Sequence, residues 1–261
     1  MFMFLLVSFL ASIVGAVCGI GGGVIIKPVL DLFRLETVAA IQFLSGCTVL
    51  SMSAYSVGRS IAAGEHQVER RTGSSLIIGA VTGGLLGNRL FSMVKALFPQ
   101  ASTVSAVQAV CLGIITLGTL ICTVKKESIS TKNIKSPYLS GLIGLALGLM
   151  SSFLGIGGGP INLVVLFYFF SMDTKRAAAN SLYIIFFSQL ASFLVTVASG
   201  SVPTFQWQSL ALMVAGGIGG GIVGRSLNKR MASKTVDKLF IRLMAVIIGI
   251  CIFNIWQYTA K

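Results

Sequence analysis

The sequence Gly19-Ile-Gly-Gly-Gly23 lies inside a long apolar region and interrupts the helix that this region would otherwise form. Each glycine in a helix interior costs about 1 kcal/mol relative to alanine. The same five letters return at Gly155-Ile-Gly-Gly-Gly159, where Pro160 follows directly. Irregular backbone inside a membrane is tolerated only where protein buries it or a cavity hydrates it. The repeated motif therefore indicates two deliberate breaks at places that the protein itself must enclose.

The composition around these breaks is that of a membrane protein. Of 261 residues, 55% are hydrophobic and only 10% are charged, and the mean hydropathy is +0.91. Apolar runs of about 20 residues, each long enough to cross a hydrocarbon core about 30 Å thick, recur at 38–58, 73–91, 103–124, 177–198, 209–225 and 239–258. We predict an all-α polytopic membrane protein. The net charge of +13 gathers between the runs, which favours a topology signal over nucleic-acid binding.

The spacing of the glycines indicates that the sequence consists of two duplicated halves. The two glycine motifs are 136 residues apart, and Gly79, Gly83 and Gly87 match Gly216, Gly220 and Gly224 at almost the same offset. We expect a first membrane repeat at 1–124, a basic cytoplasmic linker at 125–136 with the sequence KKESISTKNIKS, and a second membrane repeat at 137–261.

The distribution of basic residues indicates how the halves are oriented. If each glycine motif is the tip of a re-entrant hairpin, each half has one hairpin plus three transmembrane helices, and the halves form an inverted repeat. One side then holds fifteen basic residues, and the other side keeps four, namely Arg34, Arg89, Lys95 and Lys261. The basic side should be cytoplasmic, which places both termini in the periplasm. The alternative, one discontinuous span in each motif region, gives parallel halves with eight against eleven basic residues.

The hairpin arrangement predicts an anion site at the centre. A short helix should begin after each tip, at about Val24–Phe33 and Pro160–Ser171, with its N-terminus aimed inward. Such N-termini present unpaired N–H groups and roughly half a positive charge. The expected substrate-binding glycines are Gly21, Gly22, Gly23, Gly157, Gly158 and Gly159. The glycines at 79, 83, 87, 216, 220 and 224 recur every fourth residue or so, which predicts close helix packing instead.

Polar residues within the apolar runs are further candidates for contact with the substrate. Lys27 could add charge to the anion site or extend along its hairpin toward water. Asn162 could donate to an oxyanion or hold its own hairpin. The remaining candidates are Gln42, Ser45, Asn180 and Ser181, for which hydrogen bonding between helices is the alternative. All seven carboxylates fall at segment ends or in loops, so no buried acidic relay is expected.

These motifs resemble the TauE/SafE sulfite exporter family over nearly the whole chain. The resemblance rests on GIGGG followed by proline (Pro28, Pro160), on the alanine-rich starts Ala39-Ala40 and Ala177-Ala178-Ala179, and on the late G-x-x-x-G glycines followed by arginine. It implies a permease of the bacterial inner membrane for sulfite, thiosulfate or an organosulfonate. Lys27 stands where the family usually has an apolar residue.

Other functions are less compatible with the sequence. The single histidine, His66, lies in the charged stretch EHQVERR, and HExxH and Walker A motifs are absent, so we expect neither an enzyme nor a cofactor. The expected partners are a small anionic substrate and the lipid bilayer. A passive anion channel, or a transporter of another small anion such as a carboxylate, stays open as an alternative.

Overall fold

The computed structural model describes residues 2–33, 36–64, 70–97, 101–154 and 158–259. Within these ranges the chain is all-helical, as predicted. The first half contains α1 (Phe2–Cys18), α2 (Gly23–Phe33), α3 (Val38–Ala62), α4 (Arg70–Leu97) and α5 (Ala101–Val124). A short 3-10 helix at Lys126–Ser128 begins the linker, and the second half contains α6 (Pro137–Leu154), α7 (Gly159–Phe170), α8 (Thr174–Ala198), α9 (Trp207–Arg230) and α10 (Ser233–Thr259).

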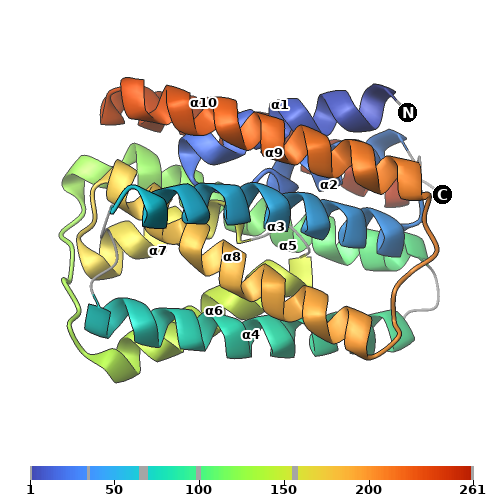
Figure 1. Cartoon of the computed structure of the whole chain (residues 1–261), viewed down its shortest axis with the longest axis horizontal. Coiled ribbons are helices and arrows are strands. Elements are labelled where there is room, and N and C mark those ends of the chain that lie inside the picture. Colours follow the sequence, from blue (N-terminus) through green and yellow to red (C-terminus); the bar gives the residue numbers. More distant parts are fainter. Residues whose placement is uncertain (1, 34–35, 65–69, 98–100, 155–157, 260–261) are drawn as a thin grey trace.

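The helices form an elongated bundle along one axis (Figure 1). Seven of the described helices are long and apolar enough to cross a membrane, and α6, with 18 residues, is the shortest of them. The protein is therefore a multi-pass membrane protein.

Polar side chains cap the N-termini of α3 and α8. Thr37 accepts from Ala40 N at 3.2 Å, and Asp173 accepts from the amides of Lys175 and Arg176. Each N-cap satisfies amides that the first turn leaves unpaired.

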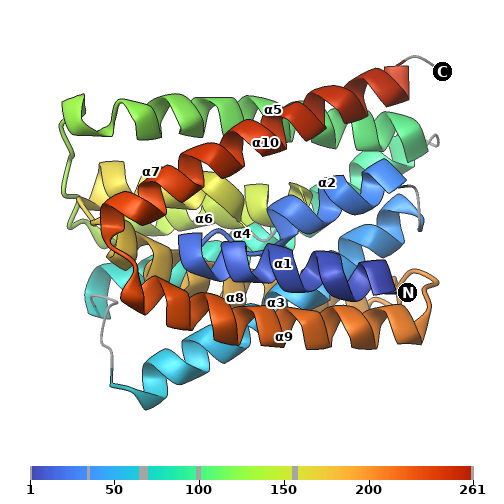
Figure 2. The ribbon, with the colours of Figure 1, turned by 90° about the horizontal axis from the view of Figure 1, so that it is seen from above.

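The chain reverses direction at both glycine motifs. In Figure 2, α1 runs inward from the N-terminus and α2 returns to the same end of the bundle. Phe4 near the start of α1 packs in one apolar cluster with Leu30 near the end of α2. In the second half, Lys132 N donates to Tyr168 O at 2.8 Å and Ile134 N donates to Phe169 O at 2.7 Å. These bonds join the segment before α6 to the end of α7, so α6 and α7 also form a helical hairpin.

Each hairpin packs on the other half of the chain. The first arm of one hairpin, α1, lies along α9, and the first arm of the other, α6, lies along α4. The packing glycines are confirmed in this role. A Cβ built at Gly83 would lie 2.0 Å from Leu145 O of α6, and one built at Gly220 would lie 2.4 Å from Phe9 O of α1. Only glycine permits backbones to approach so closely.

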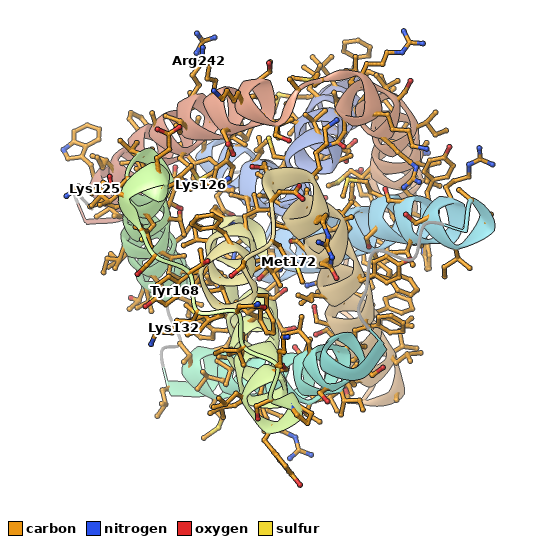
Figure 3. The ribbon with its side chains drawn as sticks, turned by 90° about the vertical axis from the view of Figure 1, so that its left-hand side faces the viewer. Lys125, Lys126, Lys132, Tyr168, Met172 and Arg242 are labelled. Atoms are coloured by element: carbon orange, nitrogen blue, oxygen red, sulfur yellow. The ribbon has the colours of Figure 1, made fainter. Side chains whose placement is uncertain are left out.

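One end of the bundle collects most of the basic residues, and we call it the basic end. Here Lys126 in the linker contacts Asp237 of α10 at 3.3 Å, while Arg225 of α9 donates to Ser56 O of α3 at 3.0 Å. Figure 3 looks onto this end and shows Lys125, Lys126, Lys132 and Arg242 distributed over it, with Tyr168 and Met172. The N-terminus and the end of α10 lie at the opposite end (Figure 1).

Candidate functional site

The first glycine tip folds tightly between α1 and α2. Gly19 and Gly21 have φ angles of 74° and 72°, a left-handed conformation that side chains other than hydrogen disfavour. Gly22 O accepts from the amides of Ile25 and Ile26 at 3.0 Å, which begins α2. A Cβ at Gly19 would lie 2.3 Å from the Cα of Ala178, so this tip touches the alanine-rich first turns of α8.

The second tip is described from Gly158 onward, and Gly157 lies outside the described residues. Gly158 has a φ of 102°, α7 begins at Gly159, and Pro160 occupies its first turn. A Cβ at Gly158 would lie 2.5 Å from Asn162 Nδ2. Proline suits this position because the first helical amides have no intrahelical acceptor. The short helices therefore begin within a residue of the predicted positions, and α2 and α7 contact each other.

Asn162 and Ser181 lie together behind the second tip. Asn162 is fully buried and its Nδ2 donates to Ser181 Oγ at 3.3 Å. Asn162 Oδ1 and the hydroxyl of buried Ser45 have no partner among the described residues. Asn180 instead turns its amide to Arg176 O in its own helix at 2.8 Å. The structure thus brings Gly158, Asn162 and Ser181 into one group and separates Asn180 from that hydrogen bond.

Lys27 reaches from the first hairpin to the second. Its side chain is 3% exposed, and Nζ donates to Leu154 O at 3.0 Å and to Gln108 Oε1. Leu154 is the last residue before the second glycine motif. Lys27 therefore places a positive charge beside the second tip, at the negative C-terminal end of α6.

Two glutamines complete this network. Gln108 Nε2 donates to Phe153 O at 2.8 Å and to Gln42 Oε1 at 3.1 Å, and Gln42 Nε2 lies 3.4 Å from Ser152 O. Three side chains from α2, α3 and α5 thus satisfy successive carbonyls that the end of α6 leaves without amide partners. Gln108 was not among the predicted site residues, although an amide in the apolar run 103–124 was a usable signal.

A pocket of about 410 Å³ opens near the first tip at the basic end. Its walls come from α1, α3, α8 and α9. Ala16 and Ala178 line it close to the glycine tip, and the basic side chains Lys175, Arg225 and Lys229 also line it. None of the described residues that line it is acidic. We call this cavity the basic pocket, and its charge favours small anions over cations or neutral solutes.

The sequence is similar to a family of known membrane proteins over nearly its whole length. Residues 4–250 match the sequence profile of the family described as Sulfite exporter TauE/SafE. The probable membrane transporter protein YunE of Bacillus subtilis is 26% identical over 93% of each chain. The probable membrane transporter protein MamO of Magnetospirillum gryphiswaldense is 31% identical over 43% of this chain and 19% of its own length. No solved structure matches the chain.

Proposed function

Because the chain belongs to the TauE/SafE sulfite exporter family, and is thus a membrane transporter, we propose that it moves a small sulfur-containing anion. Sulfite, thiosulfate and organosulfonates form the proposed substrate class. The substrate is held between the two glycine tips, against the backbone of Gly21, Gly22 and Gly23 on one side and of Gly157, Gly158 and Gly159 on the other. We further propose that the membrane is the bacterial inner membrane.

The observation that carries this proposal is the pair of short helices that begin inside the bundle. The N-termini of α2 and α7 follow glycine-rich turns, and the two helices contact each other. Helix N-termini attract anions through free N–H groups and the helix dipole. Lys27 adds a full positive charge at the second tip, and Asn162 adds a neutral donor group.

The proposed topology is an inverted repeat of the halves 1–124 and 137–261. The hairpins α1–α2 and α6–α7 enter the membrane from opposite faces, and α3, α4, α5, α8, α9 and α10 cross it. The packing of α1 on α9 and of α6 on α4 supports this arrangement, because each contact is the counterpart of the other between the halves. The basic end lies in the cytoplasm and both termini lie in the periplasm.

The basic pocket is the proposed cytoplasmic access path. Its basic side chains Lys175, Arg225 and Lys229 raise the local anion concentration, and its inner wall reaches the first glycine tip. Inverted-repeat transporters bind substrates near the midplane and open alternately to each side. A pocket that connects one face with the centre is the geometry that such a cycle requires.

Thermal stabilisation by ligands tests the proposal. Thiosulfate, sulfite, methanesulfonate and acetate would each be titrated against the purified protein, because a ligand that binds only the folded state raises Tm. We expect stabilisation by at least one sulfur anion and none by acetate. Stabilisation by acetate alone would contradict the substrate class. In reconstituted membranes, saturable flux without unitary currents is expected, whereas unitary currents would indicate a channel.

Substitution of Lys27 locates the bound anion. Charges about 4 Å apart interact by roughly 4 kcal/mol at an effective dielectric constant near 20, before desolvation is subtracted. We expect Lys27→Met to weaken anion binding by about tenfold or more, which corresponds to about 1.4 kcal/mol. Asn162→Ala should cost less, because a neutral hydrogen bond contributes about 0.5–1.5 kcal/mol. Lys135→Met, in the exposed linker, is the matched control. Unchanged affinity in Lys27→Met would remove Lys27 from the site.

A further inference from the structure

A buried carboxylate lies one helical turn after Lys27. Asp31 of α2 is 8% exposed, and its Oδ1 has no hydrogen-bond partner among the described residues. Asp31 lies at a segment end, in the last turn of α2, as expected, but the expectation that no acidic side chain is buried is wrong for it. Its place in the sequence, near the end of a short helix, gives no indication that α10 covers it.

A second unpaired oxygen lines the same space. Asn254 of α10 is 2% exposed, its Nδ2 donates to Pro28 O at 3.2 Å, and its Oδ1 has no partner among the described residues. Asp31 and Asn254 line a cavity of about 10 Å³ together with Lys27 and Gln108. This volume accommodates about one water molecule. The two buried acceptor oxygens that share this cavity both lack a hydrogen-bond donor. Burial of a polar atom without a hydrogen bond costs folding free energy.

We propose that Asp31 is a proton-binding site that takes up one proton when an anion binds beside Lys27. The inference rests on the proposed function, because it requires an anion at the second glycine tip. With the tip empty, the carboxylate of Asp31 balances the ammonium of Lys27. A monovalent anion that pairs with Lys27 leaves one negative charge in excess in a poorly polarisable environment, and a divalent anion such as thiosulfate leaves two. A proton from the accessible aqueous side converts the carboxylate to a carboxylic acid and removes one of these negative charges.

Among the described residues, Lys27 is the one basic side chain that lines the cavity with Asp31. The sequences of α1, α5, α6 and α7 contain no Asp, Glu, Lys or Arg, and in α3 the only such residue is Arg59, in its last turn at the other end. The charged residues of α10 are Lys234, Asp237, Lys238 and Arg242, all in the first part of the helix, whereas Asn254 lies near its end. The cavity itself adds the thiol of Cys251 and the amide of Gln108.

Coupling between the anion and the proton follows from the attraction between their opposite charges. If the anion strengthens proton binding at Asp31, the proton must strengthen anion binding by the same factor. The transport cycle would then carry the anion and the proton in the same direction. A pH gradient would drive accumulation of the anion, and the charge moved per cycle would be one unit smaller than that of the anion alone.

Proton uptake on ligand binding measures this site directly. Thiosulfate is the probe, because it stays a dianion at neutral pH and contributes no proton of its own. The purified wild-type protein in weakly buffered detergent solution should take up about one proton for each thiosulfate bound, as read from a pH indicator. The Kd for thiosulfate should increase by up to about tenfold per pH unit as the pH rises from about 7 to about 8. Binding without proton uptake, at an affinity independent of pH, would overturn the inference.

Variants assign the proton to Asp31. Asp31→Asn should bind thiosulfate without proton uptake and with a Kd that does not change with pH, whereas Asp31→Glu should retain the uptake. Glu127→Gln, which removes an exposed carboxylate from the linker, is the matched control and should behave like the wild type. Proton uptake by Asp31→Asn equal to that of the wild type would assign the proton elsewhere. If Asp31→Asn does not fold, a wild-type titration without proton uptake would still overturn the inference, and loss of the uptake in Asp31→Glu would count against Asp31 as its site. A wild-type protein that no sulfur anion stabilises would instead contradict the proposed function.

Discussion

The basic pocket and the equivalent region at the opposite end differ in the side chains that connect their helices. At the basic end, Arg225 of α9 spans to α3, where its NH1 donates to Ser56 O and lies 3.3 Å from Ser60 Oγ. The equivalent of Arg225 in the first half is Asn88 of α4, whose Nδ2 donates directly to Thr196 Oγ1 of α8 at 3.1 Å. The long arginine side chain spans two helices at the mouth of a cavity, whereas the short asparagine bonds directly to a side chain of the neighbouring helix.

Other equivalent positions show the same difference. Ala16 lines the basic pocket, and its equivalent Ser152 pairs with Ser192 at 2.7 Å between the Oγ atoms. Ala179 lines the pocket, and its equivalent Phe43 packs against Phe193 and Phe205, with ring centroids 6.1 and 5.3 Å apart. Side chains at the opposite end thus contact one another where those at the basic end border a cavity. Under the proposed topology, this structure is a state that is open to the cytoplasm and closed to the periplasm.

The largest expected effect is a difference in chemical access between two alanines, one near the start of α8 and the other near the start of α3. Ala179, near the start of α8, lines the basic pocket, whereas Ala40, near the start of α3, is fully buried. In a background without the five native cysteines, Ala179→Cys should react with a small hydrophilic thiol reagent about a hundredfold faster than Ala40→Cys. The second-order labelling rates in detergent measure this difference. Equal rates would show that the closed and open ends exchange freely in solution.

A smaller effect is expected from opening the aromatic contact at the closed end. Phe43→Ala removes two ring contacts, each worth about 1 kcal/mol beyond the buried area. A change of about 1.4 kcal/mol alters a conformational equilibrium tenfold. Labelling of Ala40→Cys should therefore become about tenfold faster when Phe43→Ala is added. Leu182→Ala, in the wall of the basic pocket, is the control and should leave that rate unchanged. A rate that does not respond to Phe43→Ala would show that the aromatic cluster is not the closing contact.

The sequence predicted those features that depend on local spacing. The four-residue recurrence of Gly79, Gly83 and Gly87 indicated a packing face, because residues at that spacing share one side of a helix. The starts of α2 and α7 were predicted within a residue, since glycine turns and proline restrict where a helix can begin. These signals are carried by the residues themselves and need no knowledge of their neighbours.

The missed features depend on contacts between distant helices. Gln108 joins the network only because α5 passes the end of α6, and Asp31 is buried only because α10 covers α2. The basic pocket depends on four helices from both halves. The linear pattern identified Lys27 and Gln42 as polar residues in apolar runs, but it contained no information that both face the carbonyl groups of α6.

The smallest expected effect concerns the charge that distinguishes the two ends. Arg225→Asn gives the basic pocket the residue found at the equivalent position of the closed end, and it removes one of three basic side chains from the lining. Charged clefts accelerate the association of oppositely charged ligands, and salt screens this attraction. We expect initial thiosulfate flux into proteoliposomes to fall a few-fold at low ionic strength and to approach the wild-type value at about 1 M salt, where the screening length is about 3 Å. Arg242→Asn, an exposed change at the same end, should have a smaller effect because Arg242 does not line the pocket.

A loss of flux that persists at high salt would contradict the electrostatic role. It would assign Arg225 a structural role, through its bonds to Ser56 and Ser60, and would separate the effect of the pocket's charge from that of its shape.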